Sequence, residues 1–285
     1  MQIGAIYPQN EMRGDPRALD AIGRAVEELG YDHLLMFDHV AGAVREGRAQ
    51  PLMGPYSDAD PFHDPLVSFA YLAGVTRRIG FATGILILPQ RQTLLVARQA
   101  ADVDLLSGGR LRLGVATGWN YTEYEALGED FTTRGKRLDE QMPLLRELWR
   151  GEPVAFDGRF HRLDRLALNP PPAHAIPLWC GGGSDPAYRR AARLGEGFIF
   201  SGPFDRILAG WRRLQEILAE QGRPREGFGA EYLVSVAVDP QGATDIVRRW
   251  QDEGGTHASI RTMGHGFTEA EQHIAYLDEV RQRLG

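Results

Sequence analysis

The hydrophobic residues of the chain follow two alternating spacings. Short runs of mostly apolar or small residues predict β-strands, and each is followed by a stretch with apolar residues three and four positions apart, which is typical of a helix packed on one side. Leu94, Ala97, Ala101 and Leu105 show this helical spacing. The predicted strands are residues 2–7, 33–37, 79–86, 111–116, 177–180, 197–200, 231–238 and 257–261. The predicted helices are residues 17–29, 65–76, 94–106, 134–149, 186–194, 204–221, 244–252 and 268–284.

Eight successive strand–helix units predict an α/β protein with the (β/α)₈ TIM-barrel fold. A doubly wound sheet is the alternative, but its phosphate-binding glycines usually follow the first strand. Here the residues after that strand are Tyr7, Pro8, Gln9 and Asn10. No linker rich in Pro, Gly or Ser divides the chain, so residues 1–285 are expected to form a single domain.

Two connections are longer than barrel loops usually are. Residues 40–64 form an extended loop after strand 2, and residues 151–176 precede strand 5. Within the latter, residues 154–161 predict a small hairpin around Asp157-Gly158. Because active sites of barrels lie at the carboxyl ends of the strands, the first loop is expected to be a substrate lid. The second enters its strand from the opposite face, so a structural or interface role is expected.

Composition and charge exclude several classes of protein. The chain is 43% hydrophobic and 25% charged, which is ordinary for a soluble globular protein, and its net charge of −6 argues against a nucleic-acid binder. No apolar run approaches the roughly 18 residues of a membrane span, and the first residues lack a secretory pattern. We therefore expect a cytoplasmic protein without a membrane segment.

The reactive residue types are few. Cys180 is the single cysteine, which excludes an internal disulfide and a cysteine-clustered metal site, and it follows an apolar strand as a small buried hydrophobe would. Lys136 is the only lysine and lies in a polar helical run, which argues against Schiff-base chemistry. The histidines follow no metal-binding spacing, so no metal site is predicted, although distant ligands could converge.

Asp38 and His39 end the second predicted strand, where a barrel places functional side chains. A histidine there could move a proton near neutral pH, and the adjacent carboxylate could orient it or bind a ligand. The pair alone is equally compatible with a strand-end turn in which Asp38 caps backbone amides.

Two further strand ends carry candidates. Gly84 and Ile85 lie in an apolar strand, where a glycine indicates either a bulge near a ligand or a small packing residue. After the fourth strand, Gly118 permits a sharp exit, Trp119 offers a flat apolar surface and Asn120 can donate and accept hydrogen bonds. Trp119 is compatible with packing over the barrel as well as with a ligand nearby.

A glycine-rich turn joins the fifth strand to its helix. Gly181, Gly182, Gly183 and Ser184 can direct backbone amides and a hydroxyl toward an anion at the helix start. An ionised Asp185 would repel phosphate unless it turns away to cap the helix, with Pro186 then at the first helical position. The turn is expected to bind phosphate.

Together, these stretches resemble the luciferase-like monooxygenase (bacterial luciferase-like) superfamily over most of the chain. The matching stretches are residues 83–89, 97–101, 106–120, 123–128, 134–140, 182–184, 187, 190–192 and 195–198. Any one of them would be ordinary; in combination they are specific. The resemblance implies a cofactor across the barrel mouth, with its phosphate near Gly182, Gly183 and Ser184. It also implies that the Gly84–Ile85 peptide is a cis bond beneath the cofactor ring.

Within the superfamily, the pair Asp38-His39 and residues 114–128 resemble the branch that uses the deazaflavin coenzyme F420. The resemblance implies hydride transfer between F420 and a small organic substrate. His39 would donate or accept the proton, with Asp38 as its partner or as a ring-edge contact. Trp119 would shape the pocket; Asn120 and Glu123 are weaker candidates. The resemblance also implies a homodimer.

Two alternatives stay open. The first is an FMN-dependent monooxygenase that receives reduced flavin from a separate reductase. The second is a non-catalytic barrel that binds or carries a flavin. The substrate itself is not encoded in any recognisable motif of the lid.

Overall fold

The computed structural model describes residues 1–234 and 237–285 and contains a closed ring of parallel strands. Around the ring the strands follow the order β3, β2, β1, β11, β10, β9, β8, β5, and the β3–β5 pairing closes it. Their bounds are β1 (Gln2–Ile6), β2 (His33–Met36), β3 (Gly80–Thr83), β4 (Leu86–Ile87), β5 (Leu111–Ala116), β8 (Leu178–Gly181), β9 (Gly197–Ser201), β10 (Gly229–Val234) and β11 (His257–Arg261). Within the described residues, β3 and β4 share one of eight positions, which confirms the predicted (β/α)₈ barrel.

The strand predicted at residues 79–86 is interrupted. β3 pairs with β5 through Phe81 and Leu111, and β4 resumes that pairing through Leu86 and Val115. Between them the Gly84–Ile85 peptide bond is cis, as the resemblance implies. The predicted strand 231–238 begins earlier and is strand as far as Val234; residues 235 and 236 lie outside the described part.

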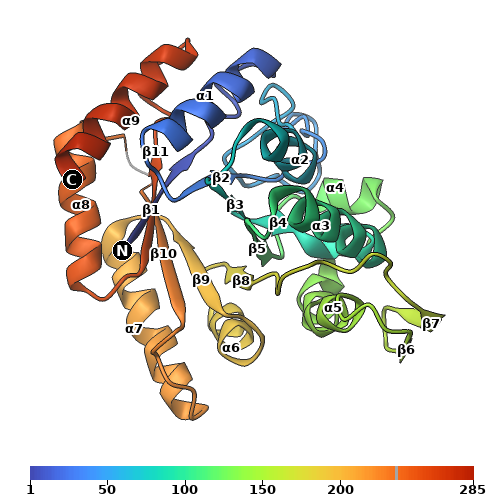
Figure 1. The fold of residues 1–285 in the computed structure, drawn as a ribbon. Helices are drawn as coiled ribbons and strands as arrows, with labels where there is room; N and C mark the ends of the chain where they lie inside the picture. Colours follow the sequence, from blue (N-terminus) through green and yellow to red (C-terminus); the bar gives the residue numbers. More distant parts are fainter. Residues whose placement is uncertain (235–236) are drawn as a thin grey trace.

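Helices surround the outside of the ring (Figure 1). They are α1 (Pro16–Glu28), α2 (Pro65–Val75), α3 (Thr93–Ser107), α4 (Tyr121–Ala126), α5 (Arg134–Leu148), α6 (Asp185–Leu194), α7 (Phe204–Glu220), α8 (Pro240–Asp252) and α9 (Ala270–Leu284). Short 3₁₀ turns, η1 (Leu88–Gln90) and η2 (Phe131–Thr133), precede α3 and α5. α4 was not among the predicted helices, because its six residues are too few to show a helical period. No helix in the described part of the chain has both the length and the apolar character to cross a membrane.

The strands separate two apolar cores. The larger core lies between the strands and the helices, and residues such as Leu34, Phe81 and Trp250 are fully or almost fully buried in it. A smaller core fills the barrel with Ile6, Leu35, Ala82, Trp179, Ile199, Leu233 and Met263. Because the interior is filled, a ligand is restricted to the ends of the barrel.

The predicted hairpin exists, but its second strand lies later than expected. β6 (Val154–Asp157) pairs with β7 (Arg162–Leu166), and Gly158 N–H donates to the His161 carbonyl across the turn. Figure 1 shows this hairpin projecting beyond α5, away from the strands. Residues 40–64 form the predicted long loop at the carboxyl end of β2.

Candidate active site

The glycine turn leaves β8 at the carboxyl end of the barrel. Gly182 has φ 131°, a conformation that only glycine adopts without strain, and the chain then enters α6 through Ser184. Ser184 occupies the N-cap position, but its hydroxyl makes no capping hydrogen bond. Asp185 stands in the first turn and its carboxylate binds the Arg213 guanidinium at 3.0 Å. Ser184 rather than Asp185 is therefore the N-cap. The Asp185 carboxylate, which could repel an anion, is instead paired with Arg213 of α7.

Cavities adjoin both sides of this turn. One of about 220 Å³ is lined by Gly84, Ile85, Gly181, Gly182, Gly183, Tyr188, Ile199, Ser201, Arg206, Ile207 and Leu233. The other, of about 570 Å³, is lined by Ile85, Ala116, Thr117, Gly118, Trp119, Arg134, Gly135, Gly181, Gly182, Gly183, Ser184, Pro186, Ala187 and Arg190. The fold thus brings Gly84, Ile85, Trp119 and the turn together, although they lie far apart in the sequence.

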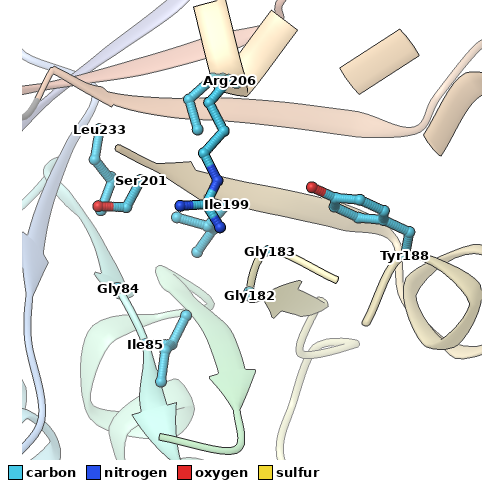
Figure 2. Close-up of a pocket in the computed structure, with 11 residues that line it drawn as sticks. Gly84, Ile85, Gly182, Gly183, Tyr188, Ile199, Ser201, Arg206 and Leu233 are labelled. Atoms are coloured by element: carbon cyan, nitrogen blue, oxygen red, sulfur yellow. The ribbon is translucent and has the colours of Figure 1, made fainter. Parts of the chain in front are cut away.

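Arginines that the sequence analysis missed give this region a positive charge. Figure 2 shows the Arg206 guanidinium reaching from α7 toward Gly183 and Ile85. In the described part of the chain, neither Arg206 nor Arg134 forms an ion pair, whereas Arg190 binds Asp139 at 2.9 Å. Two arginines without a carboxylate partner beside exposed backbone amides form a setting suited to an anion. No local signal identifies them, because they come from other barrel units.

Asp38 supports the segment that follows the cis bond. Its carboxylate accepts the Ile87 N–H at 2.8 Å and binds the Arg91 guanidinium at 2.5 Å. Arg91 also binds Asp64 at 2.9 Å, at the end of the long loop. Burial raises the pKa of Asp38, and the positive charge of Arg91 opposes this rise. Asp38 is therefore engaged with the end of β4 and with Arg91 rather than with His39.

His39 has a different carboxylate partner. Its Nδ1 lies 2.9 Å from Glu123 Oε2, while Glu123 Oε1 accepts the N–H groups of Val40 at 2.7 Å and Ala41 at 3.1 Å. Burial would raise the pKa of Glu123, but the interaction with His39 and the two backbone donors outweigh burial and lower it. The pairing of His39 with Asp38, one of the two roles expected for that aspartate, is not present in this structure.

Aromatic rings enclose His39. Tyr56, Phe62 and Trp119 have ring centroids 5.4, 5.0 and 5.4 Å from that of His39. The Gly54 backbone lies against Trp119 so closely that a Cβ atom would come within 2.4 Å of the indole. Burial raises the pKa of Tyr56, which keeps its phenol neutral. The long loop thus packs over His39 and Trp119, and its role as a substrate lid stays a prediction.

The other predicted residues take supporting positions. Asn120 is the N-cap of α4, where its side chain accepts the Thr122 N–H at 3.2 Å, and it lines neither cavity. His39 and Asp38 also lie outside the two cavity linings; Trp119 is the link between His39 and the larger one. Cys180 is buried, and burial raises the pKa of its thiol to about 12, as expected of a small hydrophobe rather than a nucleophile. The described residues include no cluster suited to a metal ion.

A closed ring of eight parallel strands with helices outside it defines the class of (β/α)₈-barrel proteins. Comparison with known families makes this more specific. The luciferase-like monooxygenase family matches residues 2–283, so the chain belongs to that family.

Several relatives and solved structures are similar to the chain. An uncharacterized protein of Mycobacterium tuberculosis is 32% identical over 247 residues, covering 84% of this chain and 83% of that protein. The F420-dependent glucose-6-phosphate dehydrogenase of Gordonia bronchialis is 30% identical over 249 residues, covering 83% and 69%. Among solved structures, an F420-dependent secondary alcohol dehydrogenase bound to an F420–acetone adduct aligns with a TM-score of 0.80 at 15% identity, covering 100% and 99%. A monooxygenase from Streptomyces bottropensis aligns with a TM-score of 0.80 at 19% identity, covering 100% and 98%. At these identities the structures support the fold alone.

Proposed function

We propose that the protein is an oxidoreductase that transfers a hydride between coenzyme F420 and a small organic substrate. The observation that carries this proposal is that the glycine turn, the Gly84–Ile85 segment and the His39–Glu123 pair lie at one barrel mouth. Similarity to F420-dependent dehydrogenases supports F420 over FMN.

The residues around the turn fit the cofactor. An F420 or FMN molecule has an anionic tail, and Gly181, Gly182, Gly183 and Ser184 offer backbone and hydroxyl donors beside Arg206. Gly84 and Ile85 line the smaller cavity, and Ile85 extends into the larger one, as expected of a platform for an apolar ring. When bound, the deazaflavin would supply the site that accepts or donates hydride.

The chain's own residues supply orientation and proton transfer. His39 would take a proton from a substrate hydroxyl or return one to a carbonyl oxygen. Trp119 forms a wall shared by His39 and the larger cavity. Asp38 acts indirectly, because it fixes Ile87 and Arg91 and so holds the segment that carries Ile85. The loop with Tyr56 and Phe62 excludes water from His39.

An FMN-dependent monooxygenase supplied by a separate reductase is the second candidate. Membership of the luciferase-like monooxygenase family keeps it as a candidate. The anion site serves either cofactor, so the choice between them depends on direct binding.

The decisive experiment titrates the purified protein with F420 and separately with FMN and follows fluorescence. We expect saturable F420 binding and hydride transfer with a panel of secondary alcohols or carbonyl compounds. FMN binding without F420 binding would reverse the choice. Tight F420 binding without turnover across the panel would instead favour a carrier barrel.

A further inference from the structure

The contacts of Glu123 connect three parts of the barrel mouth. This residue lies in the first turn of α4, whereas His39 follows β2. Its side chain is only 1% exposed, and that of His39 is 7% exposed. One carboxylate oxygen faces His39 Nδ1, and the other accepts two backbone N–H groups at the start of the long loop. Glu123 therefore contacts the candidate proton carrier and the first residues of the lid together.

The chemistry of this contact determines where the imidazole proton lies. An ionised carboxylate only accepts hydrogen bonds, so the Nδ1 atom of His39 must carry the hydrogen that joins them. In the neutral ring the other nitrogen, Nε2, is then a bare acceptor. Nε2 makes no hydrogen bond to the described residues. The titratable groups packed against the ring are Glu123 from α4 and the neutral phenol of Tyr56 from the loop.

We propose that Glu123 is a positioning residue that fixes His39 in the Nδ1–H tautomer and so makes Nε2 the atom that exchanges a proton with the substrate. This inference rests on the proposed function and names the atom that serves it. In alcohol oxidation the O–H bond would break and its proton would go to Nε2. The electron pair left on oxygen would form the carbonyl bond, and the carbon would give up its hydride to a bound deazaflavin. The imidazolium that results is balanced by the carboxylate of Glu123.

A purely structural role for Glu123 is the competing explanation, because its backbone contacts alone could hold residues 40 and 41. The two roles differ in the Glu123→Gln variant. The amide oxygen satisfies the two backbone donors, as Oε1 does now, and the NH₂ group then faces Nδ1. Since NH₂ can only donate, His39 must accept at Nδ1 and carry its hydrogen on Nε2. The substitution therefore reverses the tautomer while it preserves the clamp on the loop.

The direct test uses ¹⁵N NMR of the cofactor-free protein with labelled histidine, and His39→Asn identifies the signals of His39. We expect wild-type protein to carry the hydrogen on Nδ1 and Glu123→Gln to carry it on Nε2. Glu125→Gln is the matched control, because Glu125 is an exposed residue of the same helix, and its tautomer should equal the wild type. Hydrogen on Nε2 in wild-type protein, or on Nδ1 in Glu123→Gln, overturns the proposal. The wild-type spectrum alone decides it if the variant fails to fold.

Kinetics supply the second readout. Glu123→Gln should lower kcat by about 10²- to 10⁴-fold, the range expected for a histidine base in the wrong tautomer, with KM little changed. The pH at which turnover falls on the acidic side should differ from wild type in Glu123→Gln. It should equal the wild-type value in Glu125→Gln. Equal loss of kcat at every pH, with the wild-type tautomer retained, would indicate a structural clamp. If wild-type protein shows no turnover with F420, the proposed function fails, while the NMR result still tests the tautomer.

Discussion

Two histidine–glutamate pairs stand near opposite ends of β2, and they differ in how their charge is balanced. At the amino end, His33 Nε2 lies 2.6 Å from Glu231 inside the barrel, and Arg112 binds the same carboxylate at 2.7 Å. Just beyond the carboxyl end, His39 binds Glu123, and no arginine joins them within the described chain. The first pair belongs to a buried ion network that includes an arginine. The second is an isolated histidine–glutamate pair covered by aromatic rings.

In the ion network at the amino end, two charged groups flank the Glu231 carboxylate, although His33 Nδ1 and Arg112 Nη1 have no hydrogen-bond partner among the described residues. Ser259 donates to Glu231 at 2.7 Å, and the Arg112 guanidinium stacks on Trp179 at 4.0 Å from the ring centroid. Burial alone would raise the pKa of Glu231, but the charges of Arg112 and His33 lower it well below its usual range. At the mouth, the nitrogen of His39 that does not face Glu123 stays available. The two pairs differ in the arginine that joins only the first, so we expect the amino-end pair to serve stability and the pair at the mouth to serve proton transfer.

Replacing His39 should produce the largest effect on function. We expect His39→Ala to lower turnover with F420 by about 10²- to 10⁴-fold, because it removes the proton carrier, and to leave F420 binding largely intact. The measurements are steady-state kinetics and a fluorescence titration. His33→Asn is the matched control at the other end of β2, and its folded fraction should turn over normally. Unchanged turnover in His39→Ala would remove His39 from the mechanism.

Substitutions in the ion network of His33, Glu231 and Arg112 should change stability instead of turnover. Glu231→Ala leaves Arg112 buried without its counter-charge, so the free energy of unfolding should fall by about 3–5 kcal/mol. Urea denaturation followed by circular dichroism measures this change. Glu226→Ala, at an exposed position before β10, is the control and should have little effect. A small loss in Glu231→Ala would show that the network contributes little to stability.

The arginines at the mouth should affect affinity more than stability. Arg206→Ala should weaken F420 binding by about tenfold. This is the lower end of the range for charged hydrogen bonds, because Arg206 is exposed to solvent. Arg212→Ala on the same helix is the control, because Arg212 pairs with Glu253 away from the turn. Equal affinities of the two variants would place the anionic tail elsewhere.

His257, which lies beside His33 at the amino end of the barrel, should make the stability of the protein depend on pH. Burial, assisted by the charge of Arg112, lowers the pKa of His257 to about 3. The unfolded chain takes up a proton at this residue below its ordinary pKa of about 6.5, whereas the folded protein does not until near pH 3. Stability should therefore decline as pH falls from 6 to 4.5. His257→Gln should reduce that slope by about one proton, or about 1.4 kcal/mol per pH unit. An unchanged slope would show that His257 titrates normally in the folded state.

The sequence predicted the barrel because its signals are local. Alternating apolar runs and helical periods located every ring strand to within a few residues, and the glycines marked the turn after β8. At Gly84 the sequence left a bulge and a small packing residue as alternatives, and only the resemblance implied the cis bond. The assignment of residues 1–285 to one domain, the homodimer and the roles of the site residues stay predictions.

Long-range contacts account for what the sequence could not predict. Arg206 and Arg134 reach the glycine turn from neighbouring units, and nothing in their own segments distinguishes them from surface arginines. Asp38 and Glu123 illustrate the same limit. Adjacency in sequence favoured Asp38 as the partner of His39, but the Asp38 carboxylate binds Ile87 and Arg91, which come from another barrel unit. Glu123, a distant residue, therefore takes that place.

A crystal structure of the protein with bound F420 tests the central claim most directly. The account predicts the phosphate of the tail against residues 181–184 and Arg206, the deazaflavin ring on Ile85, and its reactive face toward Nε2 of His39. A tail anchored away from that turn, or a ring remote from His39, would contradict it.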